Sequence, residues 1–290
     1  MTSGPRDRFG LLIRPAFSGE ILANMNRVDL LHLISDDWLE APARWILAMR
    51  ELGTKIPLHL HGKELELAAS LDARSLDGVA RLVDALRPER WSEHLAGEGP
   101  CAQQTRQLVA PPRTIASIES SLRNIDRARR VVGSVPHTEI LTPQVTTTKS
   151  ELSTAEWITS VAWASGVSLV LDLDDLCDGA KRSGIRPTHA LQKLPLDRVS
   201  TVHVGGGHDT GASSESACAP DRDGELLSHE IRQLLHELGK STTQGLDVIL
   251  ERETGTSGIE HNLDTLDEIR SMLASGRRSR VEKAAVLAVR

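Results

Sequence analysis

Histidine and carboxylate side chains recur along this 290-residue sequence at the ends of short apolar segments. The recurring residues are His61, His94, Glu139, Asp172, His203 and Glu251, followed closely in three places by Asp175, His208 and Glu253. A buried carboxylate or imidazole is costly unless it is paired or binds a metal ion. Mixed imidazole and carboxylate ligands suit iron, manganese or zinc. Since there are more candidates than one ion needs, the pattern predicts a metal site that can hold more than one ion.

Other residues of the same types fit structural roles. His59 lies two residues before His61 and shares its strand face one layer deeper, where a hydrogen-bonded core role is expected. His32 fits either a core role or a functional one. The sequence has three cysteines, Cys101, Cys177 and Cys218. They are far apart and form no CxxC pair, so neither a thiolate metal site nor a disulfide framework is predicted.

Short apolar segments that alternate with longer helical patterns must position these side chains. We predict strands near residues 9–14, 28–34, 56–61, 90–95, 137–141, 167–173, 198–204 and 246–251. We predict helices near residues 18–26, 41–52, 74–87, 113–131, 152–165, 187–193, 224–239 and 260–275. Ser153 and Glu156 form a capping box that predicts the start of one helix. Loops that line a pocket are predicted at 97–111, 175–187 and 205–224.

This alternation of strands and helices predicts parallel pairing with right-handed crossovers. A single (β/α)₈ barrel of the TIM type satisfies the pattern without exposed strand edges. Its C-terminal face, where barrel enzymes carry their chemistry, would then hold the histidines and carboxylates. An open doubly wound sheet is the alternative, but no GxGxxG motif follows the first strand. We predict that residues 1–276 form the barrel and that residues 277–290 form a basic C-terminal tail.

Composition excludes several classes of protein. The net charge of −6 and the pI near 6.0 argue against a nucleic-acid-binding protein, which normally carries a basic field. The sequence contains no run of about 18 apolar residues and no apolar N-terminal segment of the signal-peptide type. We therefore predict no membrane association and a cytoplasmic location. The absence of tyrosine excludes a tyrosyl acid, base or radical.

Seven short motifs that contain or flank the candidate ligands follow one another along the chain. They are PLHLHG (57–62), WSEHLAG (91–97), QLVAPPRT (107–114), ELSTAEWI (151–158), LVLDLDDL (169–176), VHVGGGH (202–208) and VILERE (248–253). In this order they resemble motifs of the multinuclear non-heme iron-dependent oxidative enzymes, whose barrel is similar to that of xylose isomerase. The resemblance covers most of the chain, from about Gly10 to Glu253.

The resemblance implies a set of metal ligands or residues in direct support of ligands. These are His61, His94, Glu139, Asp172, Asp175, His203, His208, Asp221, Glu251 and Glu253. Asp175 stands where the family has an asparagine, and Glu253 stands where it has an aspartate. Ile140 also replaces a family asparagine, whereas Ser183 and Asp223 replace histidines. These replacements bear on how many ions are bound.

For function, the resemblance implies two or more iron ions with O₂ as co-substrate. The reaction would be oxidative modification of a ribosomally made peptide, at cysteine or at a thiol that the peptide carries. A small partner protein that recognises the peptide leader is also implied. As an alternative, the residue pattern also fits a redox-neutral isomerase or hydrolase with zinc or manganese. The replaced positions fit a third alternative, a non-catalytic relative that binds a peptide or a partner.

Overall fold

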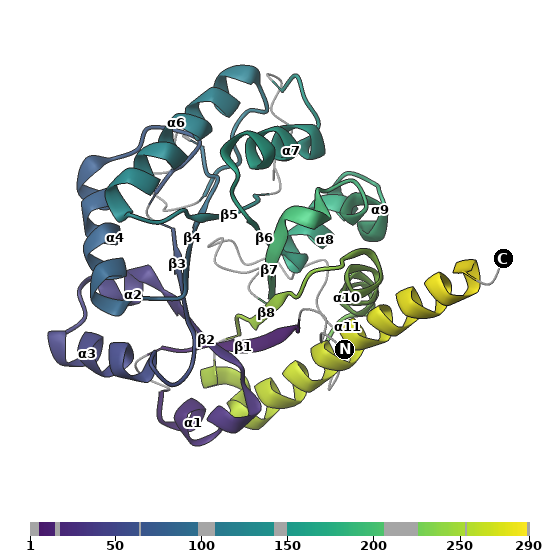
Figure 1. Cartoon of the computed structure of the whole chain (residues 1–290), viewed down its shortest axis with the longest axis horizontal. Helices are drawn as coiled ribbons and strands as arrows, with labels where there is room; N and C mark the ends of the chain where they lie inside the picture. The colour runs from purple at the N-terminus through teal and green to yellow at the C-terminus, as the bar shows by residue number, and fades with distance from the viewer. Residues whose placement is uncertain are drawn as a thin grey trace.

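The computed structural model describes residues 6–14, 18–63, 65–97, 108–141, 150–205, 226–252 and 254–288. Parallel strands close into an eight-stranded barrel in chain order, from β1 to β8, with β8 paired to β1 (Figure 1). The strands are β1 (Arg8–Leu12), β2 (Leu30–Ile34), β3 (Leu58–Gly62), β4 (Arg90–His94), β5 (His137–Glu139), β6 (Leu169–Asp172), β7 (Val199–Val204) and β8 (Asp247–Leu250). This confirms the predicted (β/α)₈ fold.

Helices follow the strands and surround the barrel (Figure 1). They are α1 (Ser18–Ala23), α2 (Ser35–Leu39), α3 (Ala43–Leu52), α4 (Ala73–Leu86), α6 (Ile115–Val132), α7 (Thr154–Ser165), α8 (Leu173–Arg182), α9 (Pro187–Leu191), α10 (His229–Ser241) and α11 (Thr254–Ala288), with 3-10 turns η2 (Met25–Arg27) and η3 (Leu196–Arg198). The predicted capping box is present at the start of α7, where the side chains of Ser153 and Glu156 each accept a backbone N–H of the other residue.

Two short helices were not predicted. In α8, which occupies most of the segment predicted as a loop at 175–187, the apolar residues Leu173, Leu176 and Cys177 follow helical spacing and are buried. The helix begins directly at the end of β6, because the side chain of Asp172 accepts the N–H of Asp175 and caps it. Helix α2 also begins directly after β2, but its N-cap residue Ile34 provides no side-chain cap.

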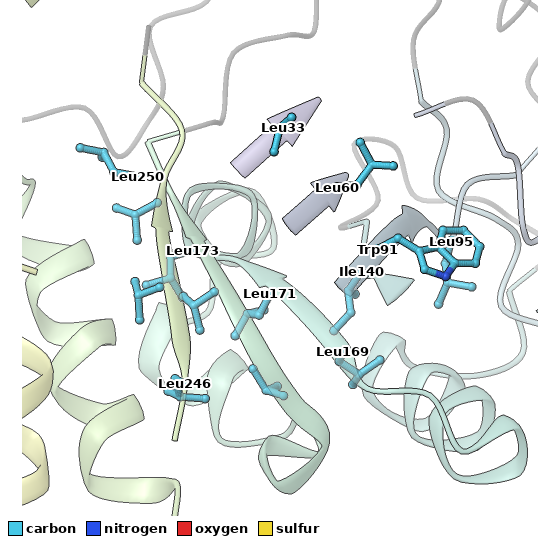
Figure 2. Close-up of a cluster of buried hydrophobic side chains, with 14 of the residues drawn as sticks. Leu33, Leu60, Trp91, Leu95, Ile140, Leu169, Leu171, Leu173, Leu246 and Leu250 are labelled. Atoms are coloured by element: carbon cyan, nitrogen blue, oxygen red, sulfur yellow. The ribbon is translucent and has the colours of Figure 1, made fainter. Parts of the chain in front are cut away.

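Strand alternation sorts the side chains into two layers. Leucine and other aliphatic residues make up most of the layer that faces outward and packs against the helices, together with a few aromatic residues such as Trp91. Figure 2 shows part of this layer, with Leu33 on β2, Leu60 on β3 and Leu171 on β6. Successive strand residues point to opposite faces. The same alternation therefore turns the neighbours His32, His61 and Asp172 toward the barrel interior.

Helix α11 packs along α10 and then projects beyond the barrel (Figure 1). The two helices approach closely at two glycines, since a Cβ on Gly276 would lie 2.0 Å from the carbonyl oxygen of His236, and one on Gly239 would lie 2.2 Å from that of Leu273. The helix is continuous across residue 277, where the sequence predicts the basic tail to begin. In the described part of the chain, no helix combines the length and apolar character that crossing a membrane requires.

Candidate metal centre

Polar side chains gather inside the barrel at the C-terminal ends of its strands. His94 and Glu139 end β4 and β5, and Glu251 directly follows β8. His61 and His203 each lie one residue before the end of their strands, β3 and β7. All except Glu251 are buried, and the side chain of Glu251 is 14% exposed. The structure thus brings together five residues that the sequence predicts as ligands.

Glu139 lies at the middle of one group of these side chains. Its Oε2 is 3.0 Å from Nε2 of His61 and 3.3 Å from Nε2 of His94. Nδ1 of His203 is 3.5 Å from the same oxygen. Burial by itself raises the pKa of Glu139, but His94, His203 and His61 outweigh it and hold the pKa well below the usual range. The carboxylate is therefore ionised at neutral pH.

Glu251 lies at the middle of a second group, which shares His203 with the first. Its Oε1 is 3.1 Å from Nδ1 of His203 and 2.8 Å from Nε2 of His32. Burial opposes ionisation of Glu251, but His203 and His32 hold its pKa below the usual range. Burial also lowers the pKa of His203, but Glu251 and Glu139 more than offset this and raise it. The two ionised carboxylates therefore place negative charge inside the barrel, which a bound cation would neutralise.

Hydrogen bonds on the far side of two rings fix their orientation. Nδ1 of His94 lies 3.0 Å from the carbonyl oxygen of Gly62, which can only accept, so Nδ1 carries the proton. Nδ1 of His61 lies 2.8 Å from the hydroxyl of Ser92, whose own proton is donated to the carbonyl of Leu60. Burial lowers the pKa of His61 to about 3, so its ring is neutral. Its Nε2 lone pair then faces the Glu139 carboxylate.

A lone pair that faces a carboxylate oxygen is repulsive unless a cation lies between them. Several polar atoms of the cluster also lack a hydrogen-bond partner among the described residues, although they are buried. They are Glu139 Oε2, Glu251 Oε1, both ring nitrogens of His203 and both ring nitrogens of His32. Buried polar atoms are nearly always satisfied, so this set calls for a ligand. Neutral imidazole and ionised carboxylate are the donors that iron, zinc and manganese take, and the residues present therefore fit a metal centre.

Two predicted ligands on β6 and α8 lie at the edge of this cluster. Asp172 is buried, and its carboxylate caps α8 through the N–H of Asp175 at 2.7 Å. Burial, together with Asp174, Glu139 and Asp175, raises the pKa of Asp172 well above its usual range. Neither Asp172 nor Asp175 belongs to the groups of described residues whose ligand atoms converge closely enough to hold one ion. Asp174 accepts the N–H of Gly205 at 2.6 Å.

Three predicted ligands, His208, Asp221 and Glu253, lie outside the described residues, as does Asp223. Cys177 is fully buried on α8 and is disulfide-bonded, contrary to the expectation that the cysteines form no disulfide. Its sulfur is therefore not a ligand.

His32 is the member of the cluster whose role the sequence left open. Its ring is buried and lies 4.9 Å from that of His203 and 5.5 Å from that of His61, measured between centroids. Burial lowers its pKa, so the ring is neutral. The signal in the sequence is the alternation in LLHLI (30–34), which places the histidine on the opposite face from Leu31 and Leu33.

A second polar group lies near the opposite, N-terminal end of the barrel and has a different character. His59 contacts Asp247 at 3.5 Å, one layer away from His61, as the sequence predicts. Asp247 accepts hydrogen bonds from Arg8 at 2.7 Å and lies 2.7 Å from Arg90. Glu89 binds Arg8 as well. Since these carboxylates are paired with arginines, this group is an ion-pair network and not a candidate cation site.

A closed barrel with a buried cluster of histidines and glutamates at its C-terminal face defines the class of this protein as a TIM barrel with a candidate metal centre. Residues 8–274 match the family described as RiPP precursor modification enzyme MbnB/TglH/ChrH, and the chain belongs to that family. This confirms the family resemblance of the motifs. The family consists of enzymes that modify ribosomally made peptide precursors.

Relatives of known sequence are similar over nearly the whole chain. A UPF0276 protein of Caulobacter vibrioides is 25% identical over 285 residues, which cover 96% of this chain and 98% of that protein. A UPF0276 protein of Anaeromyxobacter is 25% identical over 204 residues, or 70% of this chain and 72% of that protein.

Solved structures support the fold. An L-ribulose 3-epimerase matches with a TM-score of 0.57 at 14% identity, covering 97% of this chain and 98% of the other. Endonuclease IV of Thermus thermophilus matches with a TM-score of 0.56 at 15% identity, covering 92% of this chain and 99% of the other. At such low identity these likenesses show a shared barrel and no shared activity.

Proposed function

We propose that this protein is an iron-dependent enzyme that uses O₂ to modify a ribosomally made peptide, at cysteine or at a thiol that the peptide carries. The observation that carries the proposal is the buried cluster around Glu139 and Glu251, in which imidazoles and ionised carboxylates face one another with unsatisfied atoms. Membership of a peptide-modifying family supports the substrate class. The location is proposed to be cytoplasmic.

The described residues that would hold the metal are His61, His94, Glu139, His203 and Glu251. Asp172 and Asp175 lie at the edge of the cluster, and His208, Asp221 and Glu253 are proposed to complete it. We assign two or more iron ions to this set. Bound iron supplies one-electron chemistry and the capacity to use O₂, which no protein side chain here provides.

The side chains prepare the site before metal or substrate arrives. Ser92 and Gly62 hold the rings of His61 and His94 with Nε2 turned toward Glu139. The carboxylates of Glu139 and Glu251 neutralise the charge of bound cations. The closed barrel keeps water away from one side of the cluster, so electrostatic interactions there are stronger than in solvent.

A peptide substrate would reach this cluster from the C-terminal face of the barrel, where the loops after the strands lie. In this proposal a small partner protein binds the leader of the peptide, and the barrel binds only the segment that is modified. Neither nucleic acid nor a membrane is proposed as a partner.

The test of this function is co-expression with cysteine-containing peptides encoded beside the gene, followed by mass spectrometry of each peptide. We expect a mass change that requires iron and air, that is lost in Glu139→Gln, and that remains in His189→Ala, a control on the surface helix α9. Modification with zinc or manganese under strict anaerobiosis would instead support a redox-neutral enzyme. An unchanged mass with every neighbouring peptide, from iron-loaded protein in air, would contradict the proposal.

A further inference from the structure

His32 is a buried histidine that lacks the kind of hydrogen-bond partner that holds three other rings of the barrel in place. Nδ1 of His61, His94 and His137 each lies within hydrogen-bond distance of a hydroxyl or carbonyl oxygen, from Ser92, Gly62 and Ser200 respectively. In contrast, neither ring nitrogen of His32 makes a hydrogen bond with the described residues. An imidazole buried in this way loses its hydration without compensation, so its position in the barrel needs another explanation.

The contact between His32 and Glu251 has the distance of a hydrogen bond but not its direction. Nε2 and Oε1 are 2.8 Å apart, and yet neither atom has a hydrogen-bond partner with acceptable geometry. In a neutral imidazole the proton and the lone pair of a given nitrogen point along the same in-plane direction. Since that direction misses the oxygen, Nε2 is aimed at a point beside Glu251. Two ligands at about 2.1 Å from one ion lie about 3 Å or slightly more from each other. The 2.8 Å between Nε2 of His32 and Oε1 of Glu251 is close to the lower end of that range.

His203 turns toward the same oxygen. Its Nδ1 is 3.1 Å from Oε1 of Glu251, and one ligand atom from each of His32, His203 and Glu251 lies within 4.8 Å of the other two. A separate group of the same kind consists of His61, Glu139 and His203. The cluster therefore has two carboxylate centres, and His32 contacts only the one at Glu251.

We propose that His32 is a direct ligand of a second ion, held with Glu251 and His203, in the metal centre of this protein. The inference rests on the proposed metal-dependent function and adds to it a donor from β2, a strand that contributes none of the ligands predicted from the sequence. It also explains how the chain can hold more than one ion although Ile140, Ser183 and Asp223 replace family residues: β2 supplies an imidazole that those positions do not.

The experiment compares metal content in variants of the full-length chain. Each protein is loaded anaerobically with ferrous iron, or with cobaltous ion as a spectroscopic probe, then desalted and analysed by plasma mass spectrometry. His32→Ala is expected to bind one ion fewer per chain than the wild type, or to bind that ion at least about tenfold more weakly. The cobalt absorption bands of that position should disappear. His59→Ala, which removes a buried histidine of the same barrel outside the cluster, should keep full stoichiometry.

Two further variants locate the effect and guard against misfolding. Glu251→Gln should remove the same ion as His32→Ala, and the double variant should lose no more than either one. His32→Gln, which nearly preserves the volume, replaces the alanine variant if that protein is not folded by circular dichroism. Full metal content and unchanged cobalt bands in a folded His32 variant would overturn the assignment while leaving the proposed function intact. A wild type that binds no metal would overturn both.

Discussion

At the scale of single residues, the centre depends on groups that do not touch the metal. Ser92 and Gly62 accept hydrogen bonds from Nδ1 of two rings, which leaves the Nε2 lone pairs of His61 and His94 free to bind a metal ion. Loss of such a hydrogen-bond partner typically lowers metal affinity about 10- to 100-fold. The sequence predicted that the candidate ligands lie at strand ends. It did not predict which oxygen atom would form a hydrogen bond with each imidazole ring.

Ser92→Ala tests this support directly. It removes the hydroxyl 2.8 Å from Nδ1 of His61 and leaves a buried N–H unpaired. We expect metal affinity to fall about 10- to 100-fold, measured by competition with a chromophoric chelator. Ser200→Ala is the matched control, since Ser200 makes the same contact with His137 at 2.9 Å outside the cluster. Equal metal affinities in the two variants would contradict the account.

Gly62→Ala tests a second kind of support. A Cβ at this position would lie 1.9 Å from Oε1 of Glu93, a fully buried carboxylate that also accepts the N–H of Leu65. We expect a loss of about 1–3 kcal/mol in the free energy of unfolding and a weaker metal site, because the carbonyl that orients His94 must move. Urea denaturation measures the first effect and metal content the second. Gly19→Ala, where a Cβ meets nothing, should change neither; a stable, fully loaded Gly62→Ala would refute the idea.

At the scale of elements, the sequence predicted most strands well because they are apolar runs whose polar residues are regularly spaced, although β4 (RWSEH) and β5 (HTE) are not apolar. The prediction was wrong at α8. Asp174, Asp175 and Gly179 give this segment the composition of a loop, although Leu173 and Leu176 follow helical spacing. The sequence also could not predict the register shift between β6 and β7, where Leu169 pairs with Val199 but Val170 pairs with Thr201. That shift aligns Asp172 with His203.

The ion pairs at the N-terminal end of the barrel give stability a dependence on pH. Contact with His59 and hydrogen bonds from Arg8 hold the pKa of Glu89 below its usual range. A depressed folded-state pKa stabilises the protein above the unfolded-state pKa of about 4.3, and this contribution is lost as pH falls through the folded-state value. The side chain of Glu89 is 41% exposed, so the effect is about 1 kcal/mol or less.

Comparison of Glu89→Gln with the wild type checks this prediction. With chelator present, the difference in the free energy of unfolding should be constant from neutral pH to about pH 5 and should shrink below about pH 4. Glu119→Gln, a change at an exposed residue on α6, should show no such trend. A difference between wild type and Glu89→Gln that grows toward low pH would have the wrong sign for the account.

At the scale of the whole molecule, the C-terminal helix is hydrogen-bonded to the segment before β1 and to the loop before β8. Arg277, at the start of the segment predicted as a basic tail, donates to the carboxylate of Asp7 at 2.7 Å and to the carbonyl of Gln244 at 2.7 Å. The boundary between barrel and tail at residue 277 stays a prediction. A charge pattern does not reveal which arginines form hydrogen bonds with the rest of the chain.

Replacement of single arginines tests which arginines in residues 277–290 stabilise the fold and which are only exposed to solvent. Arg277→Ala should lower the free energy of unfolding by about 1–3 kcal/mol, because it leaves the carboxylate of Asp7 and the carbonyl of Gln244 without that donor. Arg278→Ala, at an exposed position next to it, should have little effect. Thermal denaturation of the two variants makes the comparison, and equal midpoints would show that the segment is a solvated tail.

The most direct test of the central claim is the iron content of anaerobically reconstituted wild-type protein, measured per chain by plasma mass spectrometry together with the Mössbauer spectrum of an iron-57 sample. The account predicts two or more irons per chain with magnetically coupled signals, and a marked loss of iron in Glu139→Gln, whose carboxylate lies between three imidazoles. A wild-type protein that binds no stoichiometric iron, or binds it equally well without the Glu139 carboxylate, would contradict the account.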